Sequence, residues 1–204
     1  MGELSVDLTK EERREQKRKL REAEDQRLRL KKLVKKTVYI LVAILVVFGI
    51  VRWITNQFPK GQDYSVTFPV LGRDHIYDGS ARPDYNSNPP TSGPHYATPA
   101  TVRFYSQELS DEQLVHNLEH GHIWVSYKPD LASEIIKVLR GFAGRNTIVT
   151  PRSANDFDIA LAAWGRLDKF NLVGNVADKQ RIRDFVLRYQ NSGPEKVNLP
   201  QHIR

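Results

Sequence analysis

Residues 110–127 read SDEQLVHNLEHGHIWVSY, and this stretch decides the fold because it encodes a helix followed directly by a strand. Ser110 and the glutamine three residues later fit a capping box, and Gly121 suits the position just beyond a helix C-terminus. We therefore predict a helix over residues 110–120. Apolar residues then recur at every second position over residues 123–127, a period that predicts a strand.

An H-x-x-E-H sequence lies inside the predicted helix, formed by His116, Glu119 and His120. Histidines four residues apart share one helix face, which is a common start of a metal site. The same helical wheel puts them nearly opposite the apolar stripe that contains Leu114 and Leu118. The alternative to a metal site is a polar face exposed to solvent.

Two further histidines precede this helix, His75 and His95, and His122 follows it. His95 belongs to the segment YNSNPPTSGPHY, whose prolines favour one fixed loop conformation. Neutral imidazole is the commonest protein ligand for transition metals. We therefore expect metal ligands at His116, His120, His95 and His75.

The composition limits the chemistry of such a site. The chain has no cysteine, and its one methionine is the first residue. This excludes thiolate zinc sites, iron–sulfur clusters, disulfides, a cysteine nucleophile and methionine-rich copper sites. Imidazole ligands without thiolates suit Zn²⁺ or Cu²⁺, so we expect one of these ions as the cofactor.

Residues 37–54 read TVYILVAILVVFGIVRWI, with a single charge at Arg52. A helix of this length extends about 27 Å, which is close to the thickness of the bilayer core. The stretch has no polar face and no cleavage signal after it. We predict an uncleaved transmembrane anchor whose partner is membrane lipid.

Charge predicts the orientation of this anchor. Residues 1–36 carry 13 basic and 8 acidic side chains, and the remainder carries 18 and 16. The positive-inside rule then places the N-terminus in the cytoplasm and the C-terminal domain outside it. Since the basic excess is a topology signal, we expect no nucleic-acid partner, and the sequence identifies no protein partner. Lysines at the membrane border contact lipid headgroups in this interpretation: Lys31, Lys32, Lys35 and Lys36.

The expected organisation is a charged arm over residues 1–36, the anchor over 37–54, a linker over 55–62 and one domain over 63–204. Periodicity in this domain predicts strands and helices in an α+β fold with a mixed sheet. The expected strands are 64–70, 123–127, 147–150 and 159–164, and the expected helices are 110–120, 129–140 and 179–189.

The motifs YNSNPPTSGPHY, VHNLEHGHIWVSYKP and LAAWGR occur in this order, followed by a closing helix before SGPE. With them the chain resembles the domain-of-unknown-function family DUF3105, which is found in membrane-anchored prokaryotic proteins. The resemblance covers roughly residues 60–197. It implies that His75, His95, His116, Glu119 and His120 belong to a shared pattern, and it brings no established activity.

Three functions remain open on these residues. The first is an extracytoplasmic domain that binds a transition metal through the histidines. The second is a zinc hydrolase with Glu119 as general base, since H-x-x-E-H is the inverzincin order, and with a third ligand from His95, His75 or a later carboxylate such as Glu134. The third is an envelope domain without metal, in which Glu119 bonds to His95 and fixes the proline loop to the helix.

Overall fold

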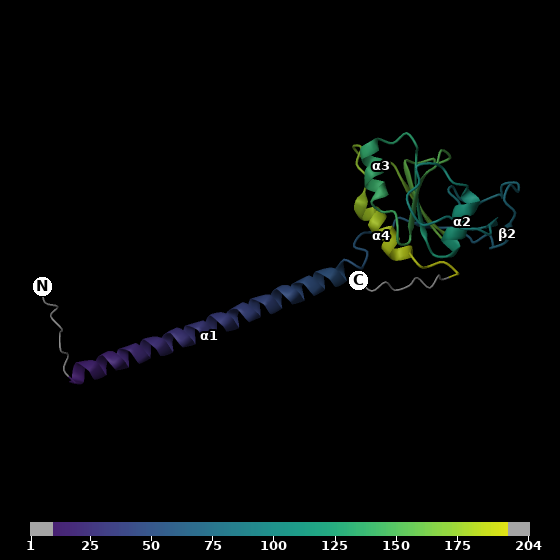
Figure 1. Ribbon diagram of the computed structural model, residues 1–204. Helices are drawn as coiled ribbons and strands as arrows, with labels where there is room; N and C mark the ends of the chain where they lie inside the picture. Colours follow the sequence, from purple (N-terminus) through teal and green to yellow (C-terminus); the bar gives the residue numbers. More distant parts are fainter. Residues whose placement is uncertain (1–9, 196–204) are drawn as a thin grey trace. The chain divides into compact units, whose positions relative to one another are not determined.

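The structure, a computed structural model, describes residues 10–195. The chain separates into two compact units, Met1–Asn56 and Gln57–Arg204. The first unit contains one helix, α1 (Lys10–Thr55), which continues without a break from the charged arm into the apolar stretch (Figure 1). By its length and composition, α1 is able to cross a membrane.

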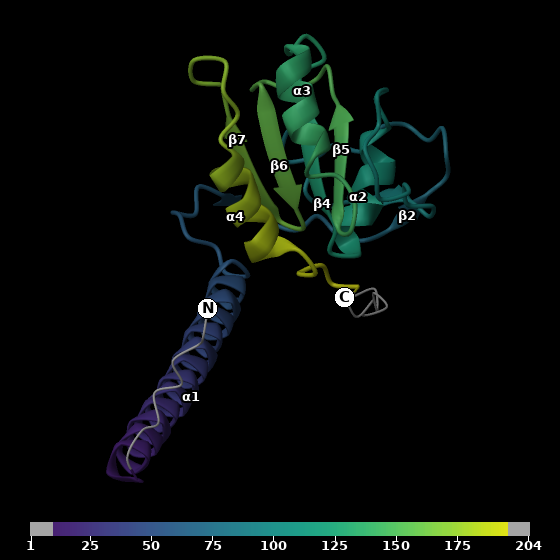
Figure 2. The same ribbon diagram turned by 60° about the vertical axis from the view of Figure 1, so that its left-hand side comes forward.

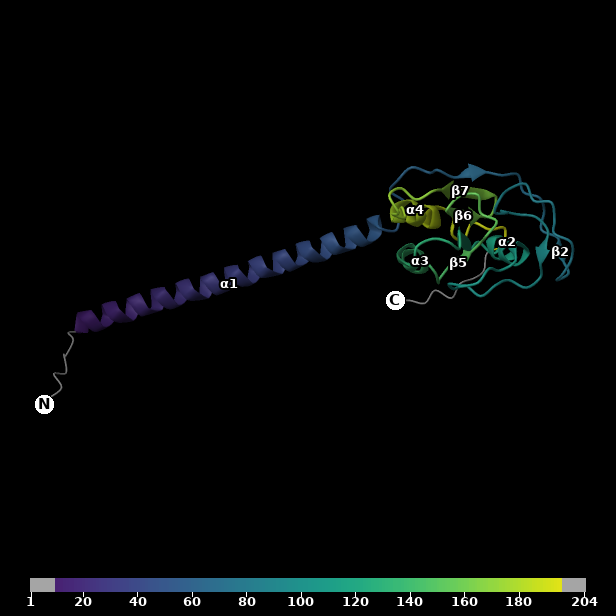
Figure 3. The same cartoon turned by 90° about the horizontal axis from the view of Figure 1, so that it is seen from above.

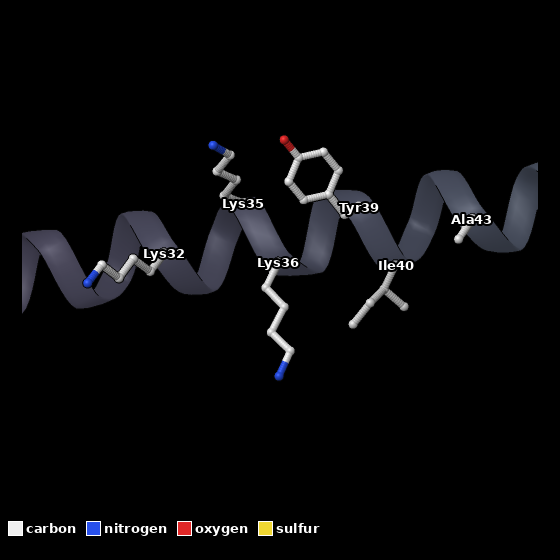
Figure 4. A pocket seen from close by; sticks show the side chains of 6 residues that line it. All are labelled: Lys32, Lys35, Lys36, Tyr39, Ile40 and Ala43. Atoms are coloured by element: carbon white, nitrogen blue, oxygen red, sulfur yellow. The ribbon is translucent and has the colours of Figure 1, made fainter.

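The border between the charged and apolar parts of α1 is lined by lysines and one aromatic ring. Figure 4 shows Lys35 and Tyr39 projecting from one side of the helix, with Lys36 and Ile40 on the other. The Lys35 ammonium lies 5.8 Å from the centre of the Tyr39 ring. Basic and aromatic side chains at this position are typical of a membrane–water interface.

The second unit, called the α+β unit below, is built on a five-stranded mixed sheet, as predicted. Its strands are β1 (Val66–Thr67), β4 (Ile123–Tyr127), β5 (Thr147–Pro151), β6 (Ile159–Ala163) and β7 (Arg166–Phe170). Their order is β1-β7-β6-β4-β5, in which only β4 and β5 are parallel. All five residues of β4 are buried, because this strand lies between β6 and β5 and both of its faces are covered.

Helices cover the two faces of the sheet (Figure 2). On one face lie α3 (Ser133–Arg140) and α4 (Lys179–Tyr189), whose side chains pack on inward residues of β4 and β6. On the other face lies α2 (Asp111–Glu119), where Leu114 and Leu118 pack against Trp124. The helix that carries the histidines is therefore fixed to the sheet by its apolar stripe.

The predicted cap of α2 and the predicted bounds of α4 are confirmed, and the fold differs from the predictions at three other places. Ser110 caps α2 by accepting from the Gln113 N–H, and α4 has the predicted bounds. The strand expected over residues 64–70 shrinks to β1, where Val66 is 59% exposed at the sheet edge. The helix expected from residue 129 begins only at Ser133, after an extended residue.

The third correction is β7, which the sequence did not predict. Its sequence RLDKF places an aspartate in a buried strand position. Asp168 is only 3% exposed, and it is paired by two hydrogen bonds from Arg181 on α4, of 2.9 and 2.5 Å. A buried carboxylate with such a partner is tolerated in a core, but it interrupts the apolar periodicity that marks a strand.

A small second sheet lies within the glycine- and proline-rich segment, residues 72–99. Its two short parallel strands are β2 (His75–Ile76) and β3 (His95–Tyr96), and this segment runs past α2 on the outside of the unit (Figure 3). It covers the polar face of α2, where His116 and Glu119 are 5% and 2% exposed. The alternative of a solvated polar face is therefore wrong for His116, while His120 is partly exposed, at 22% of its side chain.

Candidate functional site

Buried polar contacts hold the proline-rich segment in place. The Tyr85 hydroxyl donates to the Pro94 carbonyl oxygen at 2.7 Å, and burial raises the pKa of this phenol above its ordinary range. The Arg152 side chain, only 3% exposed, donates to both Asp111 carboxylate oxygens at 2.8 Å and to the Asn88 amide oxygen at 2.6 Å. The segment is thus fastened to the start of α2, which fixes where β3 lies.

The parallel pairing of β2 and β3 sets His75 directly opposite His95. Their ring centres are 5.1 Å apart with the rings edge to face. His116 reaches the same place from α2, stacked on His75 at 5.3 Å and edge to face with His95 at 5.0 Å. Each of these histidines, the histidine trio below, offers one ring nitrogen, and the three nitrogens lie within 4.8 Å of one another.

Backbone carbonyls fix the tautomers of the two buried members of the trio. His95 Nδ1 lies 2.8 Å from the Gly93 carbonyl oxygen, and His116 Nδ1 lies 2.6 Å from that of Tyr96. A carbonyl oxygen only accepts, so each Nδ1 carries a hydrogen and donates it. In the neutral ring, the lone pair is then on Nε2, which is the arrangement that prepares a histidine to bind metal through this atom.

Burial lowers the pKa of His116 below its ordinary value, and the neighbouring His120, His95 and His75 act in the same direction, while the bond to Tyr96 opposes them. His116 is therefore a neutral imidazole near pH 7. His75 is the exposed member of the trio, so the cluster is open to solvent on that side.

His120 lies beside the trio without belonging to it. Its Nε2 is 2.8 Å from Nε2 of His116, and its Nδ1 is 3.8 Å from a carboxylate oxygen of Glu195. His116 has only a lone pair on Nε2, so His120 supplies the hydrogen in this contact. Its side chain is 22% exposed, and rotation about its side-chain bonds brings Nε2 toward or away from the trio.

Glu119 is engaged by two neighbours. Its Oε2 is 3.1 Å from Nε2 of His95, and its Oε1 is 3.7 Å from Nε of Arg73. Because His95 donates from Nδ1, a neutral His95 and an ionised Glu119 would face each other with lone pairs only. A cation between or beside them, or one additional proton, resolves this conflict.

One suggested ligand, Glu134, and one neighbouring histidine, His122, lie outside the trio. Glu134 is on α3, which packs on the opposite face of the sheet from α2, so it is not a third ligand. His122 lies behind the cluster with its ring centre 6.4 Å from that of His120, and burial lowers its pKa. Its Nδ1 is 3.4 Å from the Asn117 amide.

The sequence did not identify the groups that surround the trio. The Gly93 and Tyr96 carbonyls are backbone atoms, and Arg73 has no distinguishing neighbour in the sequence. Trp164, the tryptophan of LAAWGR, packs on the sheet and also points its ring edge-on toward His95, with ring centres 6.4 Å apart. The one signal in the sequence for these surrounding groups was the proline-rich motif around His95, which predicted a fixed loop there.

Comparison with known proteins identifies the family of the chain. No curated protein and no solved structure matches the chain. The family match begins at Asp78, three residues after His75, so this histidine precedes the matched region. Residues 78–201, which are 124 of the 204 residues, match the family described as "Protein of unknown function (DUF3105)", and the chain belongs to this family.

Proposed function

We propose that the α+β unit binds a transition-metal ion, Zn²⁺ or Cu²⁺, through Nε2 of His95 and His116 together with a ring nitrogen of His75. The observation that carries the proposal is the pair of backbone acceptors at Gly93 and Tyr96, which leave the lone pair of each of these two neighbouring buried rings on Nε2. Burial of two imidazoles without a ligand to bind would cost free energy that hydrogen bonds only partly offset.

The spacing of the trio suits such an ion. Two nitrogens bound to one tetrahedral zinc at the usual Zn–N length are about 3.3 Å apart. The ring nitrogens of the trio already lie within 4.8 Å of one another, so small side-chain rotations close the difference. His120 is the best candidate for a fourth ligand, because its Nε2 already touches that of His116.

The open side at His75 favours exchange of the ion. Structural zinc sites are closed by four fixed protein ligands, whereas here the fourth candidate, His120, is partly exposed, so its position can be given up to an exchangeable group. The absence of thiolates agrees with moderate affinity. We therefore infer that the unit takes up and releases metal, as in sensing, storage or delivery.

We also propose that α1 anchors the chain as a single-pass membrane protein with its N-terminus in the cytoplasm. The support is the basic excess before the apolar stretch together with the lysines and Tyr39 at its border. The metal site would then face the extracytoplasmic side. Labelling intact cells with a membrane-impermeant thiol reagent tests this orientation. A cysteine introduced in the α+β unit should react, and one introduced before α1 should not.

A second function is favoured by the contact between His95 and Glu119. If that pair carries a proton and no metal, the same residues form a hydrogen-bonded lock between the proline-rich segment and α2. The hydrolase alternative needs Glu119 free to act on a water molecule. In the structure this carboxylate is occupied by His95 and Arg73, so the proposal gives it the role of a negative charge beside the ion at Nε2 of His95.

Metal titration of the full chain in detergent tests the proposal. We expect one Zn²⁺ or Cu²⁺ per chain, and we expect His75→Ala to weaken binding at least tenfold. His122→Ala removes a neighbouring imidazole outside the trio, and it should leave the stoichiometry and the affinity unchanged. Equal loss in both variants, or no uptake by the unmodified protein, would leave the hydrogen-bonded lock as the function of these residues.

A further inference from the structure

A groove of about 680 Å³ lies between α3 and α4, on the face of the sheet opposite the histidine trio. Its floor is apolar and consists of partly buried side chains: Val138, Phe142, Val186 and Leu187. Its rim carries four exposed basic side chains: Lys137, Arg145, Lys179 and Arg183. Glu134 is the one acidic residue among the lining residues, so the groove is strongly positive.

The four basic side chains are unpaired. Across residues 10–195, none of them makes a hydrogen bond, an ion pair or a ring contact. Elsewhere in the unit, basic side chains form ion pairs within the fold, as Arg152 does with Asp111 and Arg181 with Asp168. Four unpaired cations around an apolar floor form a surface that suits a ligand with a negative head and an apolar body.

The position of the groove along the chain indicates which ligand this is. Gln57 lines the groove and follows Thr55, the last residue of α1, by two residues. Two residues of chain span about 7 Å at most. If α1 crosses a bilayer, the groove is therefore tethered at the bilayer surface, where lipid headgroups are present at high effective concentration.

We propose that this groove binds anionic phospholipid of the membrane that α1 spans. The basic rim would contact the phosphate groups, and the apolar floor would contact the glycerol and upper acyl region. The proposal rests on the anchoring proposed above and is independent of the metal site. An acidic amphipathic helix from a protein partner is the competing occupant, but nothing tethers such a helix at the groove.

The test uses the full chain in nanodiscs of phosphatidylcholine alone and of phosphatidylcholine mixed with phosphatidylglycerol. Because the chain has no cysteine, Gln190→Cys places a single fluorophore in the groove. A headgroup-labelled quencher lipid reports contact. We expect strong quenching only in the anionic discs, and we expect little for the same label at Tyr77→Cys, a position on the loop after β2 that is 89% exposed.

Charge removal gives the matched comparison. Each basic side chain near an anionic surface changes the bound-to-free ratio about fivefold, so Lys137→Gln/Arg183→Gln should lower it about 25-fold. Arg103→Gln/Lys128→Gln removes the same charge outside the groove and should leave the quenching nearly unchanged. These two pairs separate binding in the groove from general attraction to the membrane.

Three results would overturn the proposal: equal quenching in neutral and anionic discs, no quenching in either, or equal loss in the two charge-removal pairs. The second result would leave a protein partner as the occupant of the groove. A chain that does not insert into the discs at all would overturn the membrane anchoring as well, which distinguishes the two failures.

Discussion

His95 Nε2 lies 3.1 Å from Oε2 of Glu119, while Nδ1 of the same ring donates to the Gly93 carbonyl. Both ring nitrogens of a fully buried histidine thus face acceptors. The contact needs a positive charge, supplied either by a proton or by a metal ion. A metal ion at this contact corresponds to the metal-binding function, and a proton corresponds to the hydrogen-bonded structural lock.

Glu119→Gln distinguishes the two. The amide can donate to Nε2 of a neutral His95, so the metal-free protein should keep its stability to within about 1 kcal/mol. The same hydrogen bond occupies the lone pair, and the substitution removes the negative charge beside the ion, so metal affinity should fall about 10- to 100-fold. Urea unfolding and zinc titration of the same variant measure both effects.

Glu134→Gln is the matched control, because this exposed carboxylate is on α3, on the face of the sheet opposite the histidine trio. We expect little change in either measurement. If Glu119→Gln instead leaves metal affinity unchanged, Glu119 does not support metal binding at His95.

Arg152→Met should strongly destabilise the α+β unit. The substitution leaves the buried Asp111 with only the half-exposed Arg82, which donates to it at 2.5 Å. Breaking a buried pair in this way costs about 3–5 kcal/mol. Lys128→Met breaks a more exposed pair, 3.6 Å from Asp158, and should cost at most about 1 kcal/mol. Comparable losses in the two variants would show that the proline-rich segment is not fastened through Arg152.

Gly121 follows α2 with φ +79°, and a Cβ there would lie 2.7 Å from Cα of Asn191. Gly121→Ala should therefore cost more than the roughly 1–2 kcal/mol of a left-handed alanine alone. Gly174→Ala, at φ +60° with open space around it, measures that conformational cost by itself. Chemical denaturation of the two variants should show the difference, and equal destabilisation would mean that residues 191–193 do not pack on Gly121 in solution.

The α+β unit should lose stability in acid through Asp184. Burial acts to raise the pKa of this carboxyl, but backbone N–H groups of Lys60 and Gly61, at 2.9 and 2.7 Å, and the Gln180 amide outweigh it and hold the pKa below 3.8. Since the folded pKa is lower than the unfolded pKa, this contribution is present above about pH 4 and disappears as the pH falls through the folded pKa.

Asp184→Asn should therefore lower the unfolding free energy by about 1–2 kcal/mol at pH 7. The gap to the unmodified protein should close as the pH falls through the lowered pKa of Asp184 in the folded state. Asp156→Asn removes a half-exposed carboxylate paired with Lys169, and it should change stability by at most about 1 kcal/mol. A gap for Asp184→Asn that does not depend on pH would contradict the hydrogen-bonded carboxylate.

Local signals in the sequence were sufficient for part of this structure. The Ser110 cap and Gly121 defined α2 to within one residue, and the apolar stripe of α4 defined that helix. The sequence also grouped His116 and His120 correctly on one helix face, where their rings are 4.6 Å apart. Helix caps and periodicity depend only on neighbouring residues, so one sequence suffices to read them.

The rest depends on contacts between residues distant in the chain. The pairing of His75 with His95 arises from two-residue strands, which are too short to show a period. The cover over α2 depends on Arg152, which lies 41 residues beyond its partner Asp111. Strand β7 was not predicted because the buried charge of Asp168 interrupts its apolar pattern. Its partner, Arg181, is on another element and could not be identified from the neighbouring residues.

X-ray absorption at the zinc edge of the zinc-loaded full chain tests the central claim most directly. The account predicts one zinc per chain with at least three imidazole nitrogens at about 2.0 Å. His75→Ala should remove one imidazole from this shell, and His122→Ala should remove none. A shell of oxygen ligands, or fewer than three imidazoles in the unmodified protein, would contradict metal binding by the histidine trio.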